Sequence, residues 1–331
     1  MGFDYRLLGR SGLRVSDICL GGLSLGREGG DPCEAVLEAF AAAGGNFIDL
    51  ANRYGEGEAE RQVGAAVAGD RGRWVLATKY SLSMRPGDPN AGGNSRKCMI
   101  ASLEDSLRRL GTDYIDLFWL HAWDFTTGVE EIMRALDHLT GSGKILHAGI
   151  SDTPAWIVSG ANTLSVLRGW TPFSAVQLRY SLLDRTAERD LIPMAEHFGL
   201  SITGWGTLGS GALADPESRQ AANEDSARII ATLGQFATAL GMTPAQVASA
   251  WVRCRQPGLI PVIGIGRVSS LDALLASRRL VLEPHHMEQL DAVSAVAPGF
   301  PHDFLQRDSV GRAIHGDAFG RITFPPARAL P

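Results

Sequence analysis

Trp74-Val75-Leu76-Ala77-Thr78 is a short stretch that is apolar on both faces and is followed at once by the charged residue Lys79. A strand with one wet face alternates apolar and polar residues, whereas a strand covered on both faces reads as a continuous apolar run. The stretch therefore predicts a buried strand of a parallel sheet.

The same pattern recurs along the chain, and helical patterns fill the gaps. We expect the other strands at residues 18–20, 46–50, 115–120, 145–150, 175–178, 200–204 and 259–263. Eight alternations of strand and helix favour a closed (β/α)8 TIM barrel, with an open doubly wound sheet as the alternative. We expect a single domain over residues 1–331, with an N-terminal hairpin and an irregular Pro- and Gly-rich tail, 297–331, laid over the barrel.

Two helix ends have clear signals. Asp31-Pro32-Cys33-Glu34 is typical of an N-cap, a proline at the first helical position and a capping-box Glu. Gly111 follows apolar residues at helical spacing and predicts a C-terminal cap. Residues 83–93 and 213–225 look like insertions between elements.

Composition excludes several classes of function. The net charge is −5 and there is no long basic run, which disfavours nucleic acid or an anionic membrane surface as a partner. No apolar run approaches the ~20 residues that span a bilayer. The four cysteines form no CxxC or CxxH pair, so we expect no metal site, and we expect reduced thiols in a cytoplasmic protein.

Each predicted strand ends in a polar, aromatic or glycine residue. In a parallel barrel all the carboxyl ends of the strands open on one face, and that face carries the active site. Residues scattered over the chain are therefore expected to converge there, in the order Gly21, Asp49, Lys79, His121, Ser151, Gln177, Trp205 and Gly264.

Asp49, Tyr54, Lys79 and His121 form a set suited to carbonyl reduction. A free tyrosine has a pKa near ~10, and a neighbouring ammonium group lowers it. A carboxylate holds the lysine in place, and a histidine orients the carbonyl oxygen. Such a set protonates an oxygen as hydride reaches the carbon, and because side chains supply no hydride, a nicotinamide cofactor is implied.

The sequence resembles the aldo-keto reductases. Residues 47–57, FIDLANRYGEG, are similar to that family's D-x-A-x-x-Y-G-x-G signature, and its lysine and histidine strands are matched at 76–79 and 113–121. The resemblance covers nearly the whole chain, and 91–97 and 121–124 are most similar to the aryl-alcohol-dehydrogenase-like branch. It implies that Asp49, Tyr54, Lys79 and His121 are the catalytic tetrad.

The resemblance also implies a cofactor site. Ser151, Asp152 and Gln177 would hold the nicotinamide carboxamide, Asp152 standing where asparagine is usual, and Trp205 would stack on the ring. The remaining implied contacts are Gly22, Leu23, Asp49, Gly206, Thr207, Leu208, Gly209, Ser210, Gly211, Gly264, Arg267 and Leu271. Arg267 is a donor for the 2′-phosphate, whereas Leu274 stands where an asparagine is expected. We therefore expect a modest preference for NADP(H), with NAD(H) still usable.

Two stretches of the sequence are similar to phosphate-binding motifs of other folds. Residues 204–209 fit GxGxxG, but 211–216 are a poor helix start, which disfavours a Rossmann site. Residues 141–144 resemble a phosphate loop, but a helix precedes them and a strand follows, which is the reverse of the order that such a loop requires. They therefore predict a helix end. A cofactor-binding regulatory subunit of the same superfamily remains the alternative function, whereas paired carboxylates for a hydrolase are lacking. Trp123, Phe125 and Phe304 favour a bulky or aromatic carbonyl or alcohol as substrate.

Overall fold

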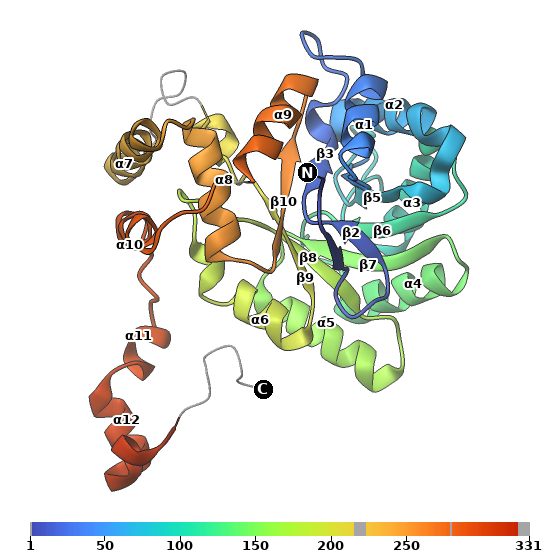
Figure 1. The fold of residues 1–331 in the computed structure, drawn as a ribbon. Helices are drawn as coiled ribbons and strands as arrows, with labels where there is room; N and C mark the ends of the chain where they lie inside the picture. Colours follow the sequence, from blue (N-terminus) through green and yellow to red (C-terminus); the bar gives the residue numbers. More distant parts are fainter. Residues whose placement is uncertain (1, 215–222, 279, 324–331) are drawn as a thin grey trace.

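The computed structural model describes residues 2–214, 223–278 and 280–323, and eight parallel strands in it close into a barrel surrounded by helices (Figure 1). The strands pair in chain order, and β10 closes the ring between β9 and β3. Their bounds are β3 Cys19–Gly21, β4 Phe47–Asp49, β5 Val75–Tyr80, β6 Ile115–Leu120, β7 Ile145–Ser151, β8 Phe173–Arg179, β9 Ser201–Trp205 and β10 Leu259–Gly264. The predicted TIM barrel is confirmed.

Helices follow the strands and cover the outside of the barrel. Two helices, α7 and α8, lie between β9 and β10, and α10 follows α9. The bounds are α1 Cys33–Ala42, α2 Glu58–Val67, α3 Arg96–Leu110, α4 Val129–Gly141, α5 Ala155–Arg168, α6 Leu191–Phe198, α7 Glu224–Leu240, α8 Pro244–Arg255, α9 Val268–Ser277 and α10 Pro284–Val293. Part of the insertion predicted at 213–225 lies outside the described residues. As predicted, Gly111 caps α3 with a left-handed φ of 63°, and α4 ends at Gly141.

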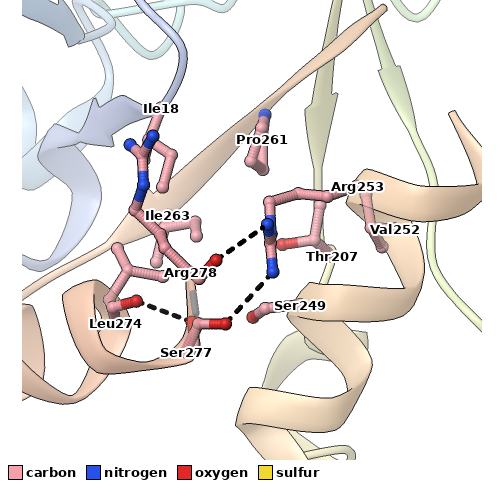
Figure 2. Close-up of a pocket in the computed structure, with 10 residues that line it drawn as sticks. All are labelled: Ile18, Thr207, Ser249, Val252, Arg253, Pro261, Ile263, Leu274, Ser277 and Arg278. Atoms are coloured by element: carbon pink, nitrogen blue, oxygen red, sulfur yellow. Dashed lines mark hydrogen bonds between the residues drawn. The ribbon is translucent and has the colours of Figure 1, made fainter. Parts of the chain in front are cut away.

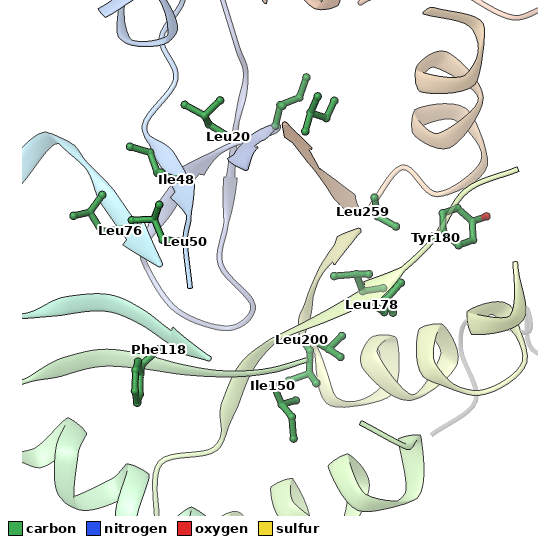
Figure 3. Close-up of a cluster of buried hydrophobic side chains, with 14 of the residues drawn as sticks. Leu20, Ile48, Leu50, Leu76, Phe118, Ile150, Leu178, Tyr180, Leu200 and Leu259 are labelled. Carbon is green, nitrogen blue, oxygen red and sulfur yellow. The ribbon is translucent and has the colours of Figure 1, made fainter. Parts of the chain in front are cut away.

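Side chains that point outward from the strands form the main core. Leu20, Ile48, Leu76 and Phe118 are fully buried between the barrel and the helices (Figure 3). Burial of this apolar surface is the main force that holds the helices on the barrel. The N-terminal hairpin, β1 Tyr5–Leu7 and β2 Arg14–Ser16, confirms the expected one. Leu8, just after β1, and Val15 of β2 pack into the inner cluster and close the floor of the barrel.

Side chains that point inward form a second buried cluster, which includes Val75, Ala77, Leu117 and Trp119. The Trp119 indole fills the barrel beneath the mouth, where a Cβ on Gly149 would lie only 2.3 Å from its ring, so only glycine fits there. Because side chains alternate along a strand, the inward row on each strand continues to the residue at its carboxyl end. Lys79 follows Ala77 on this row, and His121 follows Trp119 just past β6.

The C-terminal segment is arranged differently from what we expected. Its described part forms α11 His302–Leu305, α12 Asp308–His315 and a short 3₁₀ helix, Gly316–Arg321, and these extend away from the barrel instead of lying over it (Figure 1). None of the three has a buried residue, so no core contact holds them on the barrel. Residues 324–331 of the predicted tail lie outside the described residues.

Candidate active site

The four residues of the candidate tetrad meet at the carboxyl ends of β4, β5 and β6. Lys79 lies at the centre and is fully buried, and its Nζ forms an ion pair with the buried Asp49 carboxylate. The same Nζ donates to the Leu50 carbonyl oxygen at 2.8 Å and lies 3.2 Å from the Tyr54 hydroxyl. The three donor positions of the ammonium group are thus used by one carboxylate, one carbonyl and the tyrosine.

The charges of this cluster depend on burial. Burial alone would lower the pKa of Lys79, but Asp49 and Tyr54 outweigh it and raise that pKa, so the lysine stays charged. Burial raises the pKa of Tyr54, and the Lys79 charge opposes this rise without overcoming it. Our expectation of a lowered Tyr54 pKa is therefore corrected: the phenol is held in its protonated form because it is desolvated and Asp49 partly offsets the lysine.

His121 is placed beside Tyr54. The two ring centres lie 6.1 Å apart with the rings nearly perpendicular, at 84°. Burial, assisted by the Lys79 charge, lowers the pKa of His121 to about 3, so the imidazole is neutral at physiological pH. Its Nδ1 is buried and has no hydrogen-bond partner among the described residues. A neutral imidazole can hydrogen-bond a carbonyl oxygen but cannot act as the main acid.

Loops on the His121 side are tied by a reciprocal pair that sequence reasoning missed. The Asn94 N–H donates to Asp124 Oδ2 at 2.7 Å, and the Asp124 N–H donates to Asn94 Oδ1 at 2.8 Å. Asn94 Nδ2 also donates to the Ala122 carbonyl oxygen at 2.9 Å, next to His121. The wall of the site above β5 and β6 is therefore fixed by hydrogen bonds between two loops.

The predicted carboxamide residues lie at the neighbouring strand ends. Ser151 and Gln177 are buried opposite each other in the β7–β8 register, and Ser151 Oγ and Gln177 Nε2 lack partners within the described part of the chain. Buried polar atoms are normally hydrogen-bonded, so these two atoms on neighbouring strand ends are free to bind a ligand with both donor and acceptor groups. An amide such as nicotinamide carboxamide fits them.

Asp152 and Trp205 are joined to each other. The Trp205 indole N–H donates to Asp152 Oδ1 at 3.0 Å, across the ends of β7 and β9. The Arg179 guanidinium lies 5.7 Å from the centre of the indole ring, and Arg179 pairs with Asp184 at 2.6 Å. Sequence reasoning missed Arg179, although it lies two residues after Gln177 and so belongs to the same inward row of β8.

The predicted pyrophosphate loop follows β9. Gly206, Gly209, Ser210 and Gly211 all have left-handed φ angles, between 54° and 96°, and Gly209–Gly211 form a 3₁₀ turn instead of the helix that a Rossmann site requires. Thr207 is buried, whereas Leu208 is half-buried. Gly22 and Leu23 lie in a 3₁₀ turn after β3, which is separated from β9 by β10 alone, and Leu23 is 50% exposed.

The candidate 2′-phosphate end is less open than expected. Arg267 is exposed, but its Nε and Nη2 donate to the Gly29 carbonyl oxygen at 3.1 and 2.8 Å. Leu271 and Leu274 are buried, and Figure 2 shows Leu274 and Thr207 among the residues around a small cavity of about 10 Å³ between β10, α8 and α9. The predicted contacts of Arg267, Leu271 and Thr207 with a cofactor stay predictions.

Asp31 has a different role from the one we predicted. Helix α1 begins at Cys33 with no side-chain cap, so the Asp31 N-cap is wrong. The Asp31 N–H donates to the Gly266 carbonyl oxygen at 2.9 Å, and its Oδ2 accepts from the Val268 N–H at 2.9 Å. This backbone bond holds Asp31 beside α9, so its carboxylate caps that helix instead.

Metal-binding clusters and membrane-spanning helices are both lacking in the described part of the chain. Among residues 2–214, 223–278 and 280–323 there is no group of three His, Cys, Asp or Glu side chains that could hold a metal ion. Within the same residues no helix is long and apolar enough to span a bilayer.

Comparison with known proteins agrees with the fold. The Aldo/keto reductase family model matches residues 17–295. Norsolorinic acid reductase of Aspergillus flavus is 38% identical over 327 residues, covering 92% of this chain and 84% of that protein. An aryl-alcohol dehydrogenase of Pestalotiopsis microspora is 36% identical, covering 91% and 85%. The aryl-alcohol dehydrogenase [NADP(+)] of Phanerodontia chrysosporium is 34% identical, covering 100% and 96%.

These matches define the protein as an NAD(P)-dependent oxidoreductase of the class that interconverts carbonyls and alcohols. The chain belongs to the aldo/keto reductase family and, within it, to the aryl-alcohol-dehydrogenase-like branch.

Proposed function

We propose that the protein reduces an aldehyde or ketone to an alcohol with hydride from a nicotinamide nucleotide and a proton from Tyr54. The contact between Tyr54 and the buried Lys79–Asp49 pair is the observation that carries this proposal. A tyrosine that keeps its proton in the resting site is a donor, and a fixed ammonium beside it stabilises the phenolate left after transfer.

The residues divide the work as follows. The Tyr54 O–H bond breaks as its proton moves to the substrate oxygen, and Lys79 Nζ compensates the negative charge that remains on Tyr54 Oη. Neutral His121 holds the same substrate oxygen by a hydrogen bond. Asp49 keeps Lys79 charged and in position. In the reverse direction the same atoms accept the alcohol proton, as microscopic reversibility requires.

We propose that Ser151, Asp152, Gln177 and Trp205 hold the nicotinamide and that the loop at 206–211 and the turn at Gly22 and Leu23 take the rest of the nucleotide. When bound, the nucleotide supplies or accepts the hydride at the carbonyl carbon. The unpartnered Ser151 Oγ and Gln177 Nε2 support this assignment, because an amide would satisfy both.

We also propose a modest preference for NADP(H). Arg267 supports it, since a guanidinium at the start of α9 is a strong donor to a phosphate, and a relative's name carries NADP(+). NAD(H) should remain usable because the same guanidinium is engaged by Gly29 and because Leu274 offers no polar atom.

For the substrate we propose a bulky or aromatic carbonyl compound. Relatives named for norsolorinic acid reduction and aryl-alcohol oxidation support this class. Trp123 and Phe125 lie in the loop after β6 with their rings 6.5 Å apart, and Phe125 is 75% exposed. Phe304 lies on the segment that extends from the barrel, so it lends no support here. Measuring kcat/KM for aromatic and aliphatic aldehydes with NADPH and with NADH tests this, and the aromatic aldehydes should give the higher values.

Replacing Tyr54 with phenylalanine tests the proposal. The variant should lose about a thousandfold or more in kcat and keep its affinity for nucleotide, because only the proton donor is removed. Tyr5→Phe is the matched control, since the Tyr5 hydroxyl contacts only the Gly44 carbonyl oxygen far from the mouth. A Tyr54→Phe enzyme with near-normal kcat would refute the assignment. A wild type that binds nucleotide without any turnover would favour a regulatory subunit instead.

A further inference from the structure

Asp152 carries a fixed negative charge at the mouth of the barrel. It follows Ser151 directly at the end of β7 and has a left-handed φ of 41°, a conformation that aspartate and asparagine tolerate better than most residues. Its Oδ1 accepts the Trp205 indole N–H at 3.0 Å. The backbone turn and this hydrogen bond together hold the carboxylate beside the edge of the Trp205 ring.

The two cations whose charges act on Asp152 are already paired with other carboxylates. Arg179 lies near the Trp205 ring but forms its ion pair with Asp184, and Lys79 is neutralised by Asp49. Within the described residues no Lys, Arg or His lies within ion-pair distance of Asp152. Asp152 therefore forms no ion pair of its own, and the charges of Lys79 and Arg179 offset its charge only in part.

The carboxylate also faces an open space. Asp152, Gln177, Arg179 and Trp205 line one cavity of about 490 Å³ at the ends of β7, β8 and β9. Gln177, whose buried Nε2 lacks a partner, lines this cavity and belongs to the proposed carboxamide site, so the two adjoin.

We propose that Asp152 makes the site bind the oxidised nicotinamide nucleotide in preference to the reduced one. The inference rests on the proposed function. The oxidised ring carries one positive charge and the reduced ring is neutral, whereas the phosphates and adenosine are the same in both. A fixed negative charge beside the ring therefore stabilises one form and leaves the other nearly unchanged.

An asparagine at this position would supply the same oxygen to the indole without the charge. The charge favours the state reached after hydride has left the nucleotide, so the bound couple is a stronger reductant than it would be with asparagine. Burial raises the pKa of the Asp152 carboxyl, and the Trp205 hydrogen bond opposes this rise without overcoming it. The affinities are therefore best measured at about pH 8, where a carboxyl is ionised.

Asp152→Asn is the decisive variant. Asparagine keeps an acceptor for Trp205 and tolerates the left-handed backbone, so the fold should be unaffected. Dissociation constants of NADP+ and NADPH, measured by calorimetry for wild type and variant, give the ratio Kd(NADP+)/Kd(NADPH). This ratio should rise about tenfold in the variant, almost all of it through weaker NADP+ binding, as expected for one partly exposed charge pair.

Asp190→Asn is the matched control. Asp190 also lines this cavity, at the N-cap position of α6, and its side chain makes no capping hydrogen bond. Its replacement should leave the ratio unchanged. An unaltered ratio in Asp152→Asn, or an equal shift in Asp190→Asn, would overturn the proposal. Failure of the wild type to bind either nucleotide would instead overturn the proposed function, so the two failures are distinguishable.

Discussion

The two ends of the proposed nucleotide site differ in how completely their contacts are formed by the protein itself. Around Lys79 the ammonium group is already engaged by the Asp49 carboxylate, the Leu50 carbonyl and the Tyr54 hydroxyl, and Asp49 Oδ1 alone of this group lacks a partner among the described residues. At the start of α9, in contrast, Arg267 is bound to Gly29 and the helix N-terminus is bound to Asp31.

This difference indicates what fixes the geometry of the functional groups at each end. In the proposed tetrad Asp49 and Lys79 are buried and Tyr54 and His121 are half-buried, so their geometry is set by packing and by hydrogen bonds that are already in place. The α9 end is exposed, and the groups that would take a 2′-phosphate are engaged by the chain segment between β3 and α1. A phosphate must compete with these contacts, so changes there should affect affinity modestly, whereas changes in the tetrad should affect the reaction strongly.

The largest effect is expected for Lys79→Met. Activity should fall about a thousandfold, because the phenolate left on Tyr54 would lose its compensating charge. Steady-state kcat, with urea unfolding of the same sample, checks this. The variant leaves Asp49 as an unpaired buried charge, which destabilises the fold. In the double variant Asp49→Asn/Lys79→Met this charge is removed, so loss of activity there reports lost chemistry and not lost folding. The exposed Lys97→Met should be unaffected, and an active Lys79→Met would show that Lys79 is only structural.

A smaller effect concerns the pH dependence of stability at His121. Its pKa of about 3 in the folded protein lies below the ordinary value near 6.5. Between these two values the histidine is protonated in the unfolded chain but neutral in the folded one. The neutral histidine therefore contributes stability above pH ~6.5 that is lost as the pH falls, about 2 kcal/mol by pH ~5. The free energy of unfolding should fall between these pH values by about that much less in His121→Asn.

The exposed His302→Asn serves as the control for this experiment and should follow the wild type. Parallel curves for wild type and His121→Asn would mean that His121 is protonated in the folded protein, and the proposed role as a neutral donor would fail.

The sequence predicted the barrel and the converging residues for one physical reason. Apolar runs that end in a polar residue mark both the buried strands and their carboxyl ends, so Lys79 and His121 could be placed at the mouth before the structure was known. Local patterns of this kind depend only on neighbours along the chain.

What could not be predicted depends on contacts between distant residues. Asp31 follows the N-cap pattern, yet its partner is Val268, 237 positions away. The Asn94–Asp124 pair joins two loops, and the raised pKa of Tyr54 depends on how deeply the phenol is buried. The tail was expected over the barrel because it is rich in Pro and Gly, a composition that does not reveal that its helices lack buried residues.

Arg267→Ala should weaken NADP binding about tenfold and leave NAD nearly unchanged. A single exposed guanidinium contributes one charge-assisted contact to the 2′-phosphate, and its existing bond to Gly29 limits the gain. Dissociation constants of both nucleotides for wild type and variant measure the effect. An equal loss for both nucleotides would show that Arg267 acts on the loop after β3 and does not recognise the phosphate.

The smallest effect is expected for Asp31→Asn. This variant removes a negative charge at the start of α9, whereas Arg267→Ala removes a positive one. The Asp31 carboxylate accepts the Val268 N–H at the start of α9, where a carboxylate interacts favourably with the helix dipole but repels a phosphate. Asparagine keeps the acceptor oxygen and removes the charge, so the loop should stay in place. NADP affinity should then rise about threefold because one exposed, salt-screened repulsion is removed, while NAD, which lacks the 2′-phosphate, serves as the internal control. The gain should shrink in high salt, and in an Arg267→Ala background it should persist, since the repulsion does not act through the guanidinium. An equal gain for NAD would place the 2′-phosphate elsewhere on the barrel. The start of α9 would then not be the phosphate end of the site, and its comparison with the preformed contacts around Lys79 would no longer hold.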